Sequence, residues 1–365
     1  MKVVIAGGGT GGHVTPALAV ADRLRHDHDA QVRFVGSSSG FESQLVPAAG
    51  YEFHGIDVAP LYRELSLRAA RAPIVALRSV GRARHLVHGA DVVVGMGGYA
   101  SVPSGLAAGC ERIPLVLHEQ NAIPSLSNRV LARRAAAIGT TFTSTSLRVP
   151  ARVRVERTGN PVRAAILDVP SRRGALADEA LGAFRLEPGV PTVLVFGASQ
   201  GALHIDQVLA SALPALASHE LQLIVITGRD HVAVLEDAVA GPAPRTHVAP
   251  FLDRIELAYA IADVAISRAG AGSIAELAVC GIPALLVPYP HAAANHQEVN
   301  ARELESVGAA DVLLDRDLSS ERVVAWMLEL MEDRERRRRM AAAMRAWARP
   351  DAAGRLARLV AEVAP

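Results

Sequence analysis

Cysteine, lysine and aromatic residues are scarce in this chain of 365 residues. There are two cysteines, a single lysine (Lys2), and an aromatic share of 4%. Cys110 and Cys280 lie in unrelated apolar stretches, which argues against a disulfide framework or a zinc site. The formal net charge is only +1, which excludes a nucleic-acid binder that relies on overall positive charge. Any attraction to anionic partners must come from local patches.

Long apolar runs are also missing. No run reaches the roughly 18 residues needed to cross a bilayer, and the opening "MKVVIAGGG" reaches glycine too early for a signal peptide. We therefore expect a cytoplasmic protein. A chain of this length with 50% hydrophobic residues exceeds the usual size of a single core, which predicts two packed domains.

Short β-branched runs alternate with stretches of helical periodicity, for example over residues 14–24. In the first half the runs are "KVVIA", "VRFVG", "DVVVGMGG", "IPLVLHEQN" and "AAIGTT". The pattern loosens over residues 150–170, where we expect a linker. It restarts with "PTVLVFGASQGA", "LQLIVITGRD", "ADVAISRAGAGSIAEL" and "IPALLVPYP", and ends in helices over 320–331 and 333–347 and a helical tail. The alternation predicts an α/β fold with a parallel sheet in each half.

The first glycine-rich loop, "GGGTGGHVTP", follows the first expected strand. Gly7, Gly9 and Gly12 have the spacing of a dinucleotide-binding loop. That site also needs a carboxylate after the second strand, and "VRFVG" is followed by none, so the dinucleotide interpretation is disfavoured. Two alternatives remain. The turn holds another polar group near His13, or its glycines only allow strand and helix to pack closely.

Three further turns repeat the order of strand, small residues and helix: "VVVGMGGYASVPS", "VFGASQGALH" and "ISRAGAGSIAEL". In a parallel sheet such turns lie at the carboxyl edge, where ligands bind. In the third, the amides of 270–273 suit a phosphate and Glu276 suits a ribose, although an acid there also satisfies the helix dipole. No P-loop sequence is present, so a nucleotide diphosphate would bind without a P-loop lysine.

Seven stretches in order carry a resemblance that covers residues 2 to about 310: "GGTGGHVTPALAVA", "GMGGYASVPSGLAA", "HEQNAIPSLSNR", "GNPVR", "GASQGA", "SRAGAGSIAEL" and "NHQEVNA". Together they resemble the MurG family of bacterial N-acetylglucosaminyltransferases. Other two-domain GT-B glycosyltransferases share the later turns, but we do not expect them to carry "GGTGGH" together with "HEQN".

The resemblance implies a GT-B fold, in which two Rossmann-like, doubly wound domains face each other across a cleft and a C-terminal helix crosses back to the first domain. It implies an acceptor-binding and membrane-facing domain over 1–158 with 345–365, and a UDP-sugar domain over 159–344. The implied reaction moves N-acetylglucosamine from UDP-GlcNAc, with inversion, to the C4 hydroxyl of a lipid-linked MurNAc-pentapeptide. No cofactor and no metal are implied.

Site residues follow from the matching motifs. The resemblance places Thr10, Gly11, Gly12 and Asn121 at the sugar and diphosphate, and Gln297 at the sugar hydroxyls. It places Arg163 and Ser199 at the nucleotide diphosphate, and Leu252 at uracil through its backbone. The residues that it places around ribose and phosphate are Ala271, Gly272, Ser273, Ile274, Ala275 and Glu276. Two stretches depart from the family pattern. Ala198 stands where a second glycine is usual, and "HAAAN" before His296 shifts the alignment of Gln297 by up to a residue.

The transfer needs a base for the incoming hydroxyl and a stabiliser for the departing diphosphate. We expect His13 to be the base, because histidine titrates near neutral pH, with His118 and Glu119 as rivals. Tyr99 is an expected acceptor contact, or else packs at its loop. No Asp-x-Asp pair stands beside an expected strand end as a cation site, so helix N-termini and Arg163 are the expected counter-charges. We expect no such pair to follow a strand.

A lipid-linked acceptor implies peripheral binding to an anionic membrane surface on the cytoplasmic face. The arginine-rich stretch 61–84 is the candidate surface. We expect Pro73 to start a short helix with Arg78 and Arg82 on one face; the alternative is a solvated basic face over a core stripe. The run "RERRRR" over 334–339 is expected to be a solvated helix face. Other functions left open are a GT-B transferase with a soluble acceptor, a UDP-GlcNAc epimerase, and a UDP-sugar-binding module without turnover.

Overall fold

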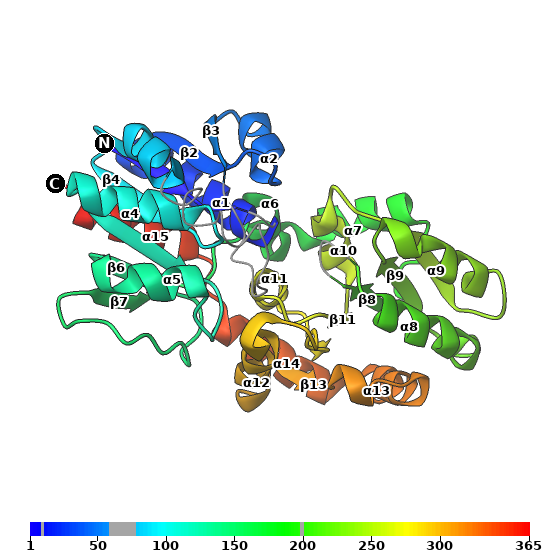
Figure 1. Cartoon of the computed structure of the whole chain (residues 1–365). Helices are drawn as coiled ribbons and strands as arrows, with labels where there is room; N and C mark the ends of the chain where they lie inside the picture. Colours follow the sequence, from blue (N-terminus) through cyan, green and yellow to red (C-terminus); the bar gives the residue numbers. More distant parts are fainter. Residues whose placement is uncertain (9–10, 58–77, 198–200) are drawn as a thin grey trace, which may run out of the picture. The chain divides into compact units, whose positions relative to one another are not determined.

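The computed structural model describes residues 1–8, 11–57, 78–197 and 201–365 (Figure 1). The chain forms two compact units. Unit 1 comprises Met1–Arg163 together with Arg349–Pro365, and unit 2 comprises Ala164–Ala348. The second unit is therefore inserted, in sequence, between the body of the first unit and its last helix.

Unit 1 is built on a seven-stranded sheet with the order β3-β2-β1-β4-β5-β6-β7. Every neighbouring pair is parallel. The strands are β1 (Lys2–Ala6), β2 (Gln31–Ser37), β3 (Glu52–Ile56), β4 (Val92–Gly95), β5 (Leu115–Glu119), β6 (Ala137–Thr140) and β7 (Arg154–Arg157). The central strands are buried and apolar because helices cover both faces of the sheet.

The helices of unit 1 include one from the far end of the chain. They are α1 (Gly11–His28), α2 (Glu42–Ala48), α4 (Ser101–Glu111), α5 (Leu126–Leu131), the short η1 (Ala132–Arg134) and α15 (Ala352–Val363). Residues 78–87 are also helical. The last helix, α15, packs against α1 and the central strands (Figure 1). Its Leu356 and Val360 are fully buried in the same core as Val3 and Ile5 of β1.

Unit 2 repeats the plan on a six-stranded parallel sheet with the order β10-β9-β8-β11-β12-β13. The strands are β8 (Thr192–Phe196), β9 (Gln222–Ile226), β10 (Arg245–Ala249), β11 (Val264–Ser267), β12 (Ala284–Leu286) and β13 (Ala310–Val312). The helices are α6 (Ala164–Leu167), α7 (Val169–Phe184), α8 (Leu203–Leu216), α9 (Val232–Val239), α10 (Ile255–Ile261), α11 (Ala271–Cys280), α12 (His296–Ser306), α13 (Ser320–Glu332) and α14 (Arg334–Trp347), with short η2 (Arg229–His231), η3 (Ala293–Asn295) and η4 (Asp315–Asp317).

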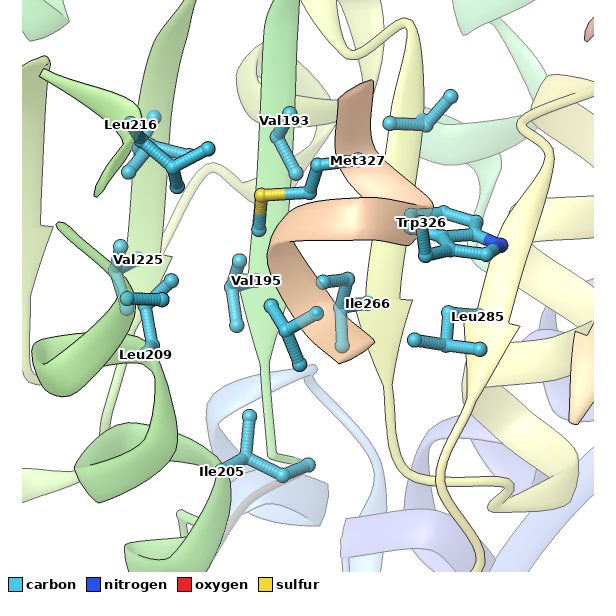
Figure 2. Packing of buried hydrophobic residues seen from close by; sticks show 14 of the residues in the cluster. Val193, Val195, Ile205, Leu209, Leu216, Val225, Ile266, Leu285, Trp326 and Met327 are labelled. Carbon is cyan, nitrogen blue, oxygen red and sulfur yellow. The ribbon is translucent and has the colours of Figure 1, made fainter. Parts of the chain in front are cut away.

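The core of unit 2 lies between the sheet and helices such as α8 and α13. Figure 2 shows Trp326 and Met327 of α13 over side chains of β8, β11 and β12, among them Val195 and Ile266. The Trp326 indole N–H donates to Asp311 Oδ2 at 2.7 Å, which gives the one polar atom of this side chain a partner at the edge of the core.

The expected α/β fold with two parallel sheets is confirmed. The units divide at Arg163 and Ala164, inside the stretch 150–170 where the linker was expected. That stretch is not an irregular connection, because it contains β7, the whole of α6 and the start of α7. The arginine run on α14 is also only partly a solvated face. Arg336 bonds Asp311 and Glu329, and Arg337 donates to the Leu330 and Met331 carbonyls, because α14 packs across the end of α13.

Candidate active site

The strand order reverses between β1 and β4 in unit 1, and between β8 and β11 in unit 2. At such a reversal the loops leave the sheet in opposite directions and open a crevice at the carboxyl edge. All four glycine-rich turns of the sequence follow one of these four strands. The turns therefore follow two neighbouring strands in each unit, β1 and β4 in unit 1 and β8 and β11 in unit 2.

In unit 1 the two turns touch through their backbones. Gly98 has a φ of 77°, and a side chain there would begin 2.2 Å from the carbonyl oxygen of Gly8. Only glycine meets both the left-handed backbone and this close approach. The Ser101 hydroxyl donates to the Gly98 carbonyl at 2.7 Å, which joins the turn to the start of α4. Tyr99 follows the turn and is 51% exposed, so its ring is available to a ligand.

His13 lies in the first turn of α1, beside the turn after β4. A Cβ placed on Gly97 would lie 2.9 Å from His13 Cδ2, so the imidazole rests against the Gly97 backbone. The ring is half-buried. Its charge also contributes to the lowered pKa of His118 on β5. The structure thus brings together two of the three base candidates at one sheet edge.

His118 is fully buried and poorly suited to act as the base. Burial, together with the charge of His13, lowers its pKa to about 4. The hydrogen bond to the Gly159 carbonyl acts in the opposite direction and raises the pKa. Its Nε2 lies 3.0 Å from that carbonyl oxygen, so Nε2 carries the hydrogen. Nδ1 is then the free acceptor, and it has no hydrogen-bond partner in the described part of the chain. The ring is a neutral group at neutral pH.

Glu119, the third candidate, is an anchor for the loop that follows β5. Its carboxylate is 1% exposed and accepts three hydrogen bonds: Oε1 from the Asn121 amide at 3.0 Å, and Oε2 from the Ser125 amide at 2.9 Å and from Asn128 Nδ2 at 2.8 Å. Three of the roughly four lone-pair sites of this carboxylate are therefore engaged. The arrangement fixes Asn121, the sugar contact implied by the family motif, at the end of β5.

A further buried carboxylate in unit 1 was not predicted. Glu42, at the start of α2, is 1% exposed and accepts from the Ser37 amide at 2.8 Å. Side chains at Gly8, Gly36 or Gly40 would begin within 2.5 Å of it. The sequence signal is the set of glycines around "SSSGFE", whose reason is visible only once the chain is folded.

In unit 2, the turn before α11 has the features of an anion site. Gly270, its N-cap residue, has an extended backbone and no side chain caps the helix. A Cβ at Gly272 would meet no atom within 4 Å, so the space over the first turn is open. Glu276 lies on the same helix, and its Oε2 accepts from the hydroxyl of buried Tyr259 at 2.8 Å. The tyrosine orients this carboxylate, a role that the sequence did not indicate.

The turn between β8 and α8 is described from Gly201 onward. Gly201 has a φ of 74°, and a Cβ there would lie 2.0 Å from the Thr227 carbonyl oxygen and 3.1 Å from His231 Nδ1. Asp206 lies in the first turn of α8, is 1% exposed, and approaches the same histidine nitrogen at 3.3 Å. Neither Asp206 nor His231 was singled out from the sequence.

Beyond these lies a second buried ionic cluster. Arg268, 6% exposed after β11, donates to Asp315 and to the carbonyls of Val287 and Pro288. Asp315 also lies 2.9 Å from His204 Nδ1. Asp315-Arg316-Asp317 is an Asp-x-Asp sequence that follows β13, a strand missing from the sequence-based assignment. The statement that no such pair follows a strand is therefore corrected, and the first of its carboxylates is ion-paired to Arg268.

The remaining predicted residues lie as follows. Thr10 and Ser199 fall outside the described residues. Gly11 and Gly12 begin α1, Ala271 to Ala275 form the first turns of α11, Arg163 is exposed at the end of unit 1, and Leu252 is half-buried after β10. Gln297 on α12 accepts from the Tyr289 amide at 3.0 Å, so one end of its side chain is held.

The basic stretch 61–84 is described only from residue 78, so Pro73 and its expected helix lie outside the described part. Arg78 and Arg82 are exposed. Arg84 differs, because its guanidinium donates to Glu111, which also lies 2.9 Å from His88 Nδ1. Its charge is therefore already balanced. Across the described residues, no helix is long and apolar enough to span a membrane.

Comparison with known proteins extends over the whole chain. Residues 3–140 match the glycosyltransferase family 28 N-terminal domain and residues 192–356 match the family 28 C-terminal domain. A curated relative from Halothermothrix orenii is 40% identical over 100% of this chain and 99% of its own length. It is named UDP-N-acetylglucosamine--N-acetylmuramyl-(pentapeptide) pyrophosphoryl-undecaprenol N-acetylglucosamine transferase. This chain belongs to the MurG family.

Other MurG relatives and solved structures agree. A Nocardioides protein with the same name is 40% identical over 100% of this chain and 98% of its own. The crystal structure of Acinetobacter baumannii MurG matches with a TM-score of 0.79 at 30% identity, covering 99% of each chain. The Neisseria meningitidis UDP-GlcNAc 2-epimerase, with a TM-score of 0.69, is only 13% identical over 99% of this chain and 100% of its own, and shares the fold alone.

Proposed function

We propose that this chain transfers N-acetylglucosamine from UDP-GlcNAc to the C4 hydroxyl of a lipid-linked MurNAc-pentapeptide, with inversion at the sugar carbon. The observation that carries the proposal is the end-to-end match with curated transferases of that name, at up to 40% identity. The site geometry supports it, because the four glycine-rich motifs of the family follow the strands at the two strand-order reversals, where α/β proteins bind ligands.

Unit 2 is the proposed donor-binding unit. The uncapped N-terminus of α11 offers backbone N–H groups and a positive dipole end to the diphosphate. Glu276, oriented by Tyr259, accepts from the ribose hydroxyls. We infer that Gln297 meets the sugar and that the Leu252 backbone meets uracil. Ser199 and Arg163 are proposed at the diphosphate.

Unit 1 is the proposed acceptor-binding unit, with His13 as the general base. As the acceptor oxygen attacks C1 of the donor sugar, His13 takes the hydroxyl proton. The C1–O bond to UDP breaks, and its electron pair leaves with the diphosphate, which the α11 amides stabilise. Asn121 and Tyr99 would hold the two sugars, while Glu119 keeps the Asn121 loop in place.

The test is UDP release in the presence of a lipid-linked muramyl acceptor. We expect His13→Ala to lower turnover by about 10²- to 10⁴-fold, the usual contribution of a general base, and to leave UDP binding unchanged. His26→Ala, at an exposed histidine of the same helix, is the matched control. Near-normal turnover in His13→Ala would refute the base assignment. Release with a soluble acceptor alone, or sugar epimerisation without transfer, would instead support the alternative functions.

Peripheral binding to an anionic membrane surface on the cytoplasmic face is proposed through the stretch 61–84. Arg78 and Arg82 are its exposed, described charges, and each contributes about 1 kcal/mol near an anionic surface. A double change to glutamate should weaken binding to vesicles that contain phosphatidylglycerol. The control is the same change at Arg334 and Arg338, two exposed arginines of α14. Equal loss in both double variants would contradict a localised docking surface.

A further inference from the structure

The carboxylate of Glu42 lies between the backbones of two glycines from different turns of unit 1. Glu42 begins α2, is 1% exposed, and accepts from the Ser37 amide at 2.8 Å. A Cβ on Gly8 or on Gly40 would lie within 2.6 Å of both carboxylate oxygens. Both backbones therefore rest directly on the carboxylate, and a side chain at either glycine would displace it.

The segment that carries Glu42 is held by its own hydrogen bonds. The Gly40 amide donates to the Ser37 carbonyl at 3.2 Å, which closes the turn before α2. The Ser43 hydroxyl donates to the Gly40 carbonyl at 2.7 Å, which ties the first residues of the helix to that turn. The Glu42 side chain thus starts from a fixed backbone and presents a fixed surface to Gly8.

On its other side, Gly8 lies against the turn that follows β4. A Cβ on Gly98 would overlap the Gly8 carbonyl oxygen, and a Cβ on Gly7 would lie 3.2 Å from the Gly97 carbonyl oxygen. The two glycine pairs therefore pack backbone against backbone. Because a glycine has no side chain that could change its rotamer, a displacement of Gly8 is passed directly to the turn at 97–98.

This turn places two residues of the proposed acceptor side. The imidazole of His13 rests on the Gly97 backbone, since a Cβ there would lie 2.9 Å from His13 Cδ2. Tyr99 directly follows Gly98 and is 51% exposed. A path of direct contacts therefore runs from the Glu42 carboxylate through Gly8 and the turn to the proposed base and the proposed acceptor contact.

We propose that Glu42 is a positioning residue for the acceptor side of the transfer. Its carboxylate fills the space beside Gly8 and so keeps the turn at 97–98, with His13 and Tyr99, in the place that the reaction requires. The role depends on the volume and the position of the side chain, because Glu42 is too deeply buried to touch a ligand. This inference rests on the proposed function, which assigns His13 and Tyr99 to the acceptor.

The experiment compares transfer kinetics with donor binding in Glu42→Ala. We expect kcat with a lipid-linked muramyl acceptor to fall by about 10- to 100-fold, because misplacing a reacting group by about 1 Å lowers a rate by up to about 10²-fold. The Kd for UDP-GlcNAc, measured by calorimetry, should be unchanged, because the proposed donor site lies in unit 2. Gln44→Ala, at an exposed position of α2, is the matched control and should behave as wild type.

Two further variants separate the volume of the side chain from its charge. Glu42→Gln keeps the size and one carbonyl oxygen for the Ser37 amide, so it should retain most of the wild-type kcat. Gly40→Ala puts a methyl group where the carboxylate lies and should lower kcat about as much as Glu42→Ala does. In the Glu42→Ala background the same methyl group should lower kcat no further, because the space that it needs is vacant.

Three results would overturn the inference: a near-normal kcat in Glu42→Ala, a loss in Glu42→Gln as large as in Glu42→Ala, or losses from Gly40→Ala and Glu42→Ala that add in full. If Glu42→Ala does not fold, Gly40→Ala alone carries the test, and a near-normal kcat in it overturns the inference. If the wild-type chain releases no UDP with the lipid-linked acceptor, the proposed function itself fails. The other results leave wild-type transfer intact, so the two failures are distinguishable.

Discussion

Replacing Glu119 by glutamine separates a structural carboxylate from a catalytic one. The glutamine keeps one carbonyl oxygen, which can serve the Ser125 amide and Asn128 Nδ2 in place of Oε2. Its NH₂ group then faces the Asn121 amide, which loses this acceptor at a partly buried position. The loss of one charge-assisted hydrogen bond and the weakening of two others should lower the free energy of opening this loop by about 3 kcal/mol. The loop after β5 should therefore open about 100-fold more often.

Hydrogen exchange measures this opening directly, because the two amides that donate to the carboxylate are themselves the probes. We expect exchange at Asn121 and Ser125 to accelerate by about the same 100-fold, with core amides of unit 2 unaffected. Glu52→Gln, at an exposed glutamate of β3 in the same unit, should change nothing beyond about 0.5 kcal/mol. If Glu119→Gln abolishes turnover while exchange stays at the wild-type rate, the carboxylate takes part in the chemistry and the anchoring argument is wrong.

Three further predictions follow from the same geometry. The pKa of His118 is lower in the folded chain than in the unfolded chain, so its contribution to stability is fully present above about pH 6.5. The free energy of unfolding should fall by about 3 kcal/mol through this group as the pH falls to about 4. His118→Gln should therefore weaken the pH dependence of the free energy of unfolding in acid denaturation. Tyr259→Phe removes the hydrogen bond that the tyrosine donates to Glu276 Oε2 and should raise KM for UDP-GlcNAc about 5- to 10-fold; an unchanged KM would contradict the ribose assignment. Gly98→Ala should destabilise unit 1 by at least about 2 kcal/mol in thermal melting, because of its left-handed backbone and the Gly8 carbonyl; a normal melting temperature would refute that clash.

The strands that the sequence did not reveal share one property. They are β3, β7, β10 and β13, which are the four outermost strands of the two sheets. An interior parallel strand is buried on both faces and reads as an apolar run, whereas an edge strand such as "RVER" is short and half exposed. Hydrophobic patterning therefore predicted the centre of each sheet, and with it the turns at the strand-order reversals.

The site could be predicted from sequence to the extent that it depends on backbone turns. Glycine spacing predicts a turn locally, so the four loops were placed on the correct strands. Buried partners are different, because they come from distant segments. Tyr259 reaches Glu276 from another helix, and His231 reaches Asp206 from another strand end. No local pattern links such pairs, and only packing brings them together.

The return of α15 to the first unit has a consequence for biogenesis. Residues 349–365 leave the ribosome after the whole of unit 2, yet Leu356 and Val360 complete the core against β1 and α1. Until then, the nascent first unit presents an uncovered apolar sheet face for the entire time that the second is translated. The order of synthesis thus makes the first half the last to mature, and a chaperone or the chain's own final turns must shield that face.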